Sequence, residues 1–204
     1  MANLNAPSGL APVMNMYTST YNGQTRRYFI PSTDTNAYAI GDPVATLTGA
    51  GDTLGVSAVT LATAGASNAL RGVITAMGGL AEGGPGGDLA NLSLMAIPAT
   101  KTKGYYVNVV DDPMVVFEVQ EWGGASFTAF TAADVGKGCN LKSGANNGQI
   151  SGWVLDTTAA SSTSSTRQVR LLGLARRGDN VFGQFAKWLV LLNQHELKAA
   201  TVGV

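Results

Sequence analysis

Residues 105–120 read YYVNVVDDPMVVFEVQ, and this stretch decides the expected fold. Its second run, VVFEVQ at 115–120, places Glu and Gln on one face and Val and Phe on the other. This period of two is typical of a half-buried β-strand. Between the two runs, Asp111-Asp112-Pro113 has the composition of a turn, because Asp side chains accept hydrogen bonds from nearby backbone amides. The stretch therefore predicts two strands joined as a hairpin over 104–120.

Similar β-forming runs recur along the chain, separated by clusters of Gly, Asn, Asp and Pro. Asn22-Gly23 lies between the runs 14–21 and 24–30, and Asn-Gly between such runs is the strongest short hairpin signal. This pattern predicts a second hairpin over 14–30. The other predicted strands are 37–40, 44–48, 56–61, 72–77, 92–97 and a hairpin of 140–142 with 150–155, followed by 168–175 and 187–193.

The fold class predicted from these runs is all-β, because helical periodicity is not sustained beyond about ten residues anywhere. Short strands at this spacing indicate an antiparallel β-sandwich or barrel, jelly-roll or β-tulip-like, with glycine-rich loops. One helical turn is predicted from Thr131, its N-cap, with Asp134 completing a capping box. Residues 1–12 are expected to form an extended N-terminal arm. Residues 13–204 form the β domain, and a division into subdomains 13–125 and 126–204 is left open.

The charge composition excludes several classes of protein. The 204 residues include 13 Lys and Arg and 13 Asp and Glu, so the formal net charge is zero and only 13% of residues are charged. Direct nucleic-acid binding is not expected, because no basic surplus exists to neutralise phosphates. A hydrophobic content of 45% excludes a disordered chain. A surface so poor in charge favours association, so we expect much of it to be covered by partners.

The N-terminal sequence MANLNAPSGLAPVMN has no basic leader region and no long apolar run, so no signal peptide is predicted. No apolar stretch approaches the ~20 residues that span a bilayer, so no membrane partner is expected. Cys139 is the only cysteine and cannot form an intramolecular disulfide. We expect it to be a buried, small apolar residue.

Residue patterns typical of an active site are missing from the sequence. His195 is the only histidine and no Cys-x-x-Cys spacing occurs, so neither a metal site nor another cofactor is predicted. Four carboxylates cluster locally: Asp111, Asp112, Glu118 and Glu121. They lack the Asp-x-Asp-x-Asp-Gly spacing of a calcium loop and fit turn and strand positions. The chain is therefore not expected to be an enzyme. The weaker alternatives are a Cys139–His195 pair and a hydrolase that uses these carboxylates.

Several segments resemble, in order and spacing, a pattern that recurs in structural proteins of tailed bacteriophages. They are 105–120, 133–136, 151–156, 170–174, 179–183 and 186–190. The resemblance covers residues 100–197, and the glycine-rich segment 78–88 departs from it. It implies a virion protein of the capsid exterior, made in the host cytoplasm, of the head decoration or cement type. The implied partners are the major capsid protein and further copies of this chain, as a trimer or dimer.

The candidate contacts with these partners are apolar residues near the N-terminus, two arginine pairs, a loop leucine and a tryptophan. They are Leu4, Leu10, Met14, Met16, Tyr17, Arg26, Arg27, Leu80, Trp122, Arg176 and Arg177. Apolar and aromatic side chains anchor interfaces, and arginine pairs bind acidic patches through forked hydrogen bonds. The alternative is a tail, baseplate or fibre-associated virion protein, in which Trp122 would stack on a host glycan. Arg177-Gly178-Asp179 spells an adhesion tripeptide but is interpreted as a turn.

Overall fold

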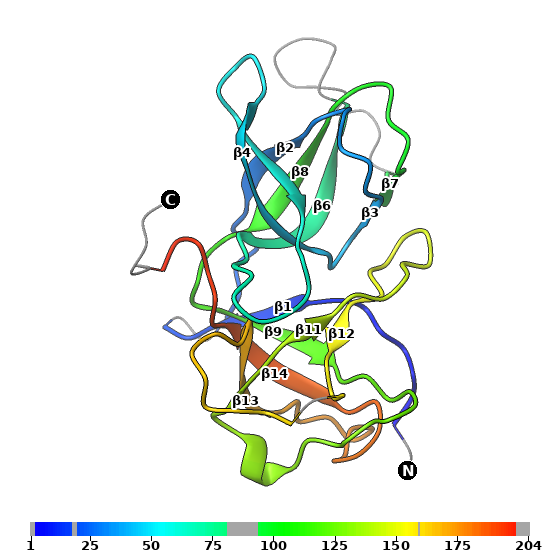
Figure 1. Cartoon of the computed structure of the whole chain (residues 1–204), viewed down its shortest axis with the longest axis vertical. Coiled ribbons are helices and arrows are strands. Elements are labelled where there is room, and N and C mark those ends of the chain that lie inside the picture. Colours follow the sequence, from blue (N-terminus) through cyan, green and yellow to red (C-terminus); the bar gives the residue numbers. More distant parts are fainter. Residues whose placement is uncertain (1–2, 18–19, 81–93, 159, 199–204) are drawn as a thin grey trace.

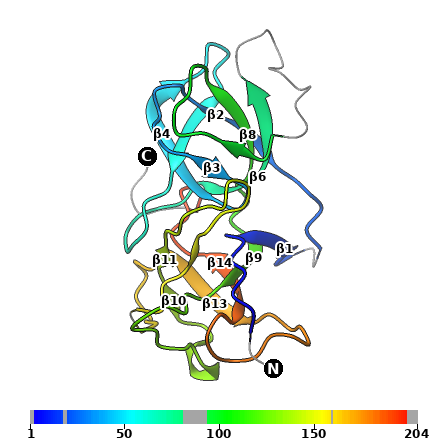
Figure 2. The same cartoon turned by 90° about the vertical axis from the view of Figure 1, so that its right-hand side faces the viewer.

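The chain forms two stacked β-lobes in a computed structural model, which describes residues 3–17, 20–80, 94–158 and 160–198 (Figure 1). One lobe is a closed barrel, and the other is built on a five-stranded sheet. Figure 2 shows the same division after a turn of 90°, with the barrel lobe above the sheet lobe. The part of the chain described contains no α-helix, so the all-β prediction is confirmed.

The barrel lobe has five strands in the closed order β2-β5-β4-β6-β8. They are β2 (Arg26–Ile30), β4 (Pro43–Gly51), β5 (Ser57–Leu61), β6 (Gly72–Leu80) and β8 (Tyr105–Val110). Neighbouring strands are antiparallel except for β2 and β5, which are parallel. Each strand contributes a buried side chain to the interior: Ile30, Val44, Val59, Ile74 and Val107. Two short strands, β3 (Tyr38–Ala39) and β7 (Ala96–Ile97), form a separate antiparallel pair.

The sheet lobe contains an antiparallel sheet in the order β1-β9-β14-β13-β10. Its strands are β1 (Ala11–Asn15), β9 (Val115–Gln120), β14 (Lys187–Leu192), β13 (Val169–Leu174) and β10 (Gly138–Cys139). The predicted pairing of 140–142 with 150–155 is confirmed by β11 (Leu141–Lys142) and β12 (Val154–Leu155). The predicted helical turn is the 3-10 helix η1 (Ala132–Asp134), and its capping box is present.

The predicted hairpin over 104–120 does not form, although both of its strands do. In the barrel, β8 pairs with β2 and β6, whereas β9 pairs with β1 and β14 in the sheet lobe. Asp111–Met114 is therefore a crossover between the lobes. Local sequence identifies a break between strands here, but it does not tell a reversal from a crossover, because the true partner strands are distant in sequence.

The predicted hairpin through Asn22-Gly23 is also wrong. β1 ends at Asn15 and pairs with β9, whereas β2 begins at Arg26 and pairs with β8. Gly23 has a φ of 81°, so the turn conformation is present without the pairing. The chain thus passes from the sheet lobe to the barrel lobe before β2 and returns to the sheet lobe after β8. The possible subdomain boundary near residue 125 refers to units that fold separately, and it stays a prediction. The barrel and the five-stranded sheet do not divide there.

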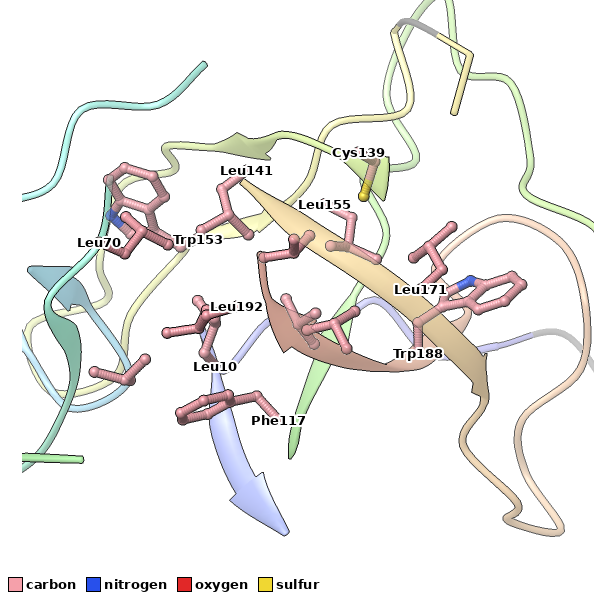
Figure 3. Close-up of a cluster of buried hydrophobic side chains, with 14 of the residues drawn as sticks. Leu10, Leu70, Phe117, Cys139, Leu141, Trp153, Leu155, Leu171, Trp188 and Leu192 are labelled. Atoms are coloured by element: carbon pink, nitrogen blue, oxygen red, sulfur yellow. The ribbon is translucent and has the colours of Figure 1, made fainter. Parts of the chain in front are cut away.

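One apolar cluster spans the junction of the lobes (Figure 3). It combines Leu70 and Val110 of the barrel lobe with Leu10 and Phe117 of the sheet lobe. In Figure 3 the cluster extends from Trp153 at one side to Trp188 at the other. Cys139 belongs to it and is buried, as predicted. Because each Å² of apolar surface removed from water contributes ~25 cal/mol, this shared core holds the lobes together.

A polar network lies at the same junction. Tyr28 Oη donates to Asp111 Oδ2 at 2.6 Å, and Arg71 Nε donates to Tyr28 Oη at 2.7 Å. Arg26 Nη1 lies 3.6 Å from the same Asp111 oxygen. Arg71 also pairs with Glu196 of the C-terminal segment, with 3.9 Å between Nη1 and Oε2. Asp111, in the crossover, is thereby tied to the barrel.

Candidate contact surface

The N-terminal segment lies along its own chain. Asn3 Nδ2 donates to the backbone oxygens of Val181 and Gln184 at 2.8 and 2.9 Å, and Asn3 Oδ1 accepts from Val181 N at 2.9 Å. Gln120 Nε2 donates to Asn5 Oδ1 at 3.0 Å, and Gln120 Oε1 accepts from Ala6 N at 2.9 Å. The described part of the predicted arm, residues 3–12, is therefore a strap on the sheet lobe and not a projection from it.

Three large apolar side chains are exposed where this strap meets the turn before β14. The exposed fractions are 78% for Leu4, 48% for Val181 and 50% for Phe182. A pocket of about 150 Å³ beside Leu4 is also lined by Arg177 and Asp179. An apolar centre with a charged rim is the usual anatomy of a protein interface. We call Leu4, Val181 and Phe182 the base patch.

A second exposed apolar group lies on and after β1. Val13 is 41% exposed, Met16 52% and Tyr17 81%, and we call these three residues the edge patch. Met14, also a predicted contact, is half-buried. Within the described residues, β1 has no strand beside it on the side away from β9. However, Pro12 and a register shift interrupt the strand, and such features protect edges from pairing. The edge patch is thus suited to side-chain packing and not to strand addition.

Of the predicted pair Arg176 and Arg177, Arg177 lies at the rim of the base patch, and both side chains are exposed. Arg177 Nη1 is 2.6 Å from Glu118 Oε1, and Arg177 Nε is 3.5 Å from Asp179 Oδ1. Asn180 N donates to Arg177 O at 3.2 Å, which confirms the turn predicted for this tripeptide. The guanidinium of Arg177 already binds two carboxylates of the same chain, whereas an adhesion ligand needs a free arginine side chain to bind its receptor.

The other pair, Arg26 and Arg27, lies on β2 of the barrel lobe. Arg26 pairs with Asp111, and the guanidinium carbon of Arg27 lies 5.2 Å from the centre of the Tyr106 ring. Both side chains are exposed. The structure therefore places the two arginine pairs on different lobes and does not bring them together.

Leu10 is not placed as predicted, whereas Trp122 keeps part of its surface exposed. Leu10 has no exposed surface and packs in the core, so it cannot serve as an intermolecular contact. Trp122 is half-buried and lines a pocket of about 310 Å³. Lys142 Nζ lies 4.7 Å from the centre of its ring, so an ammonium group is positioned over one face of the indole. The side chain of Leu80 and residues 81–88 of the glycine-rich segment lie outside the described residues.

The carboxylates considered for catalysis have structural partners. Asp112 accepts hydrogen bonds from Asn15 Nδ2 at 2.7 Å and from Met114 N at 2.8 Å, which fixes the crossover. Glu118 pairs with Arg177. Within the ranges that the structure describes, no group of three His, Cys, Asp or Glu side chains could hold a metal ion.

The environments of Cys139 and His195 disfavour the charged forms that a catalytic pair would use. Burial raises the pKa of the Cys139 thiol. Burial, together with the positive charges of Lys198 and Arg71, lowers the pKa of His195 to about 4. His195 Nδ1 accepts from Leu197 N at 3.0 Å, so the neutral ring carries its proton on Nε2.

Three residues of these surfaces were missed by sequence reasoning: Val13, Val181 and Phe182. Val181 and Phe182 follow the Asp179-Asn180 turn and precede Gly183, which has a φ of 137°. Two large apolar residues inside a turn are a usable signal, because turns lie at the surface. The exposure of Val13 follows from its place in the irregular edge of β1, which the sequence does not reveal.

Comparisons of the chain with protein-family models, with curated proteins and with solved structures find no match. Among the described residues, no helix has the length and apolar character needed to cross a membrane. Function is therefore inferred from the placement of exposed side chains together with the sequence pattern.

Proposed function

We propose that this protein is a bacteriophage capsid decoration, or cement, protein that binds the outer surface of the major capsid protein shell through its sheet lobe. The observation that carries the proposal is the presence of two exposed apolar groups, the base patch and the edge patch, on this lobe. The resemblance of the sequence to phage virion proteins supports the same class of partner.

The N-terminal segment favours such a contact electrostatically. The first 25 residues contain no charged side chain, and both patches draw residues from this stretch. Burying charged groups at an interface is costly unless they are paired, whereas apolar groups gain free energy. The segment can therefore be covered by a capsid subunit with little desolvation penalty.

A single patch is too small for tight binding. Burying one Leu or Phe side chain contributes about 1.5–3 kcal/mol, whereas association costs an estimated ~4–15 kcal/mol in lost freedom. Linking copies in a dimer or trimer would raise the effective concentration of the second and third contact. Homo-oligomerisation at a capsid symmetry axis is therefore part of the proposal.

Binding to undecorated capsids tests the proposal. Capsids purified without this protein, from the virus that encodes it, are mixed with the wild-type chain or with a Leu4→Ser/Phe182→Ser variant and sedimented. The variant should bind at least tenfold more weakly, because the apolar centre of the base patch is lost. Leu54→Ser is the matched control, since Leu54 is 67% exposed in the turn between β4 and β5 of the barrel lobe.

Equal occupancy of the shell by the double variant and the wild type would contradict the role of the base patch. The number of copies per virion separates head from tail. Hundreds of copies support decoration of the shell, whereas a handful would favour the alternative position in a tail, baseplate or fibre. A glycan bound at Trp122 in that alternative would meet the Lys142 ammonium over one face of the indole.

A further inference from the structure

Glu121 directly follows β9 and has no exposed surface. Its Oε2 accepts hydrogen bonds from Trp188 Nε1 at 3.0 Å and from Phe130 N at 3.4 Å. Its Oε1 is also buried and has no hydrogen-bond partner among the described residues. A buried carboxylate with one unpaired oxygen is unfavourable, because the ionised form loses hydration that the protein does not replace.

Trp188 connects this carboxyl group to the base patch. Its indole is fully buried at one side of the core cluster (Figure 3). The indole packs against Phe130, with 6.0 Å between ring centres, and against Phe182, with 5.7 Å. Phe182 is the half-exposed aromatic residue of the base patch. The Trp188 indole therefore contacts both the Glu121 carboxyl group and the partly exposed Phe182 ring.

The turn before β14 is linked to Glu121 by a second route. Glu121 N donates to Ala186 O at 2.8 Å, and Ala186 N donates to Gly183 O at 3.1 Å. Phe182 immediately precedes Gly183 in this turn. Backbone and ring contacts thus both run from Glu121 to the base patch.

The ionisable neighbours of Glu121 act against its charge. Burial, together with the Asp134 carboxylate, raises the pKa of Glu121 to about 7 against the opposing effect of hydrogen bonds from Trp188 and from the backbone. Burial alone would raise the pKa of Asp134 too, but hydrogen bonds such as that from Ser161 lower it to about 2. Asp134 is therefore anionic at neutral pH, with Lys137 Nζ 3.2 Å from its Oδ1. The nearby Cys139 thiol is kept neutral by burial.

We propose that Glu121 is a proton-dependent support of the base patch, so that gain or loss of its proton alters the Trp188 contact and the conformation of Phe182. In the protonated form the carboxyl group keeps the indole bond through Oε2 and is tolerated in the core. In the ionised form Oε1 needs a donor that the described residues do not supply. The chain around Glu121 must then change its conformation or admit a water molecule to supply that donor. This property belongs to the chain alone and does not depend on the proposed capsid role.

Nuclear magnetic resonance of the intact protein tests the proposal. The chain has 3 tryptophans, so a sample with labelled indole nitrogens gives three signals, and the one lost in Trp188→Phe is assigned to Trp188. This signal should shift with a midpoint near pH 7, and the backbone amides of Val181 and Phe182 should shift with the same midpoint. The amide of Leu54, in the barrel lobe, should not follow them.

Variants separate Glu121 from other titrating groups. Glu121→Gln should abolish the shift, whereas Glu118→Gln, in the strand that Glu121 follows, should retain it. The proposal is overturned if the Trp188 signal stays constant through neutrality, if its shift survives Glu121→Gln, or if Val181 and Phe182 do not follow it. If the Gln variant does not fold, the carboxyl carbon signal of Glu121 in the wild type is followed against pH instead. A midpoint near the ordinary pKa of about 4.5 would overturn the proposal.

Discussion

Tyr28 Oη, on a barrel strand, donates a 2.6 Å hydrogen bond to Asp111 Oδ2, in the crossover that leads to the sheet lobe. The two residues are 83 positions apart in sequence and both are buried. Arg71 donates to the same Tyr28 hydroxyl, so that one oxygen serves both a cation and an anion. Hydrogen bonds to ionised groups are roughly twice as strong as neutral ones, and this pair therefore fixes where the chain leaves the barrel.

Tyr28→Phe should destabilise the protein by about 1–3 kcal/mol. The variant removes one donor from the buried Asp111 carboxylate and the acceptor of the Arg71 Nε, while the ring that fills the barrel stays. Denaturant unfolding measures the loss. Tyr17→Phe is the control, because Tyr17 is 81% exposed, and its free energy of unfolding should match the wild type. Equal stability of both variants would show that the network does not hold the junction.

Glu121→Gln should stabilise the protein at alkaline pH. Burial raises the pKa of Glu121 from 4.5 to about 7, so the folded state binds this proton more tightly than the unfolded state. The associated stability is fully present below pH 4.5 and is lost as the pH rises through about 7. By linkage the loss amounts to about 3 kcal/mol. Urea unfolding at a series of pH values should show this decline in the wild type and its absence in the variant. A parallel decline in both would refute the assignment.

His195 should make the protein sensitive to acid in the opposite sense. Burial lowers its pKa from 6.5 to about 4, so the folded state resists protonation. The stability linked to the neutral ring is present above pH 6.5 and is lost as the pH falls through about 4, again by about 3 kcal/mol. His195→Gln should flatten the wild-type decline between these values, as measured by thermal unfolding. An unchanged slope in the variant would mean that other groups cause the decline.

Leu10 and Leu4 should respond differently to the same substitution. Leu10→Ala should cost about 2–5 kcal/mol of stability, because the residue lies fully inside the core. Leu4→Ala, at a side chain 78% exposed, should change the free energy of unfolding by less than about 0.5 kcal/mol. Calorimetry of both variants compares them directly. A large loss for Leu4 would show that the strap depends on its side chain as well as on Asn3.

The strands themselves are largely predictable from sequence, but most of their partners are not, the local pairing of β11 with β12 being the exception. Alternation in residues 115–120 located β9, and the Thr131–Asp134 spacing located the capped turn, because both signals are local. The turn chemistry of Asn22-Gly23 was also recognised, yet β1 and β2 pair in different lobes. Strand partners are set by long-range burial, which short-range pattern does not encode.

The contact surface was only partly predictable for the same reason. Leu4, Met16 and Tyr17 are exposed, and the charge-free segment that holds them could be recognised by composition. Leu10 belongs to the same segment but enters the core, since the chain joins the sheet edge at β1. The approach of Asn3 to Val181, 178 residues later, has no signature in sequence.

An electron cryomicroscopy map of decorated capsids tests the central claim most directly. The account predicts density for this protein on the outer surface of the shell, with the sheet lobe and its base patch, Leu4, Val181 and Phe182, against the capsid subunits. The barrel lobe should point away from the shell. Density in which the barrel lobe contacts the capsid, or density for this chain on the tail alone, would contradict the account.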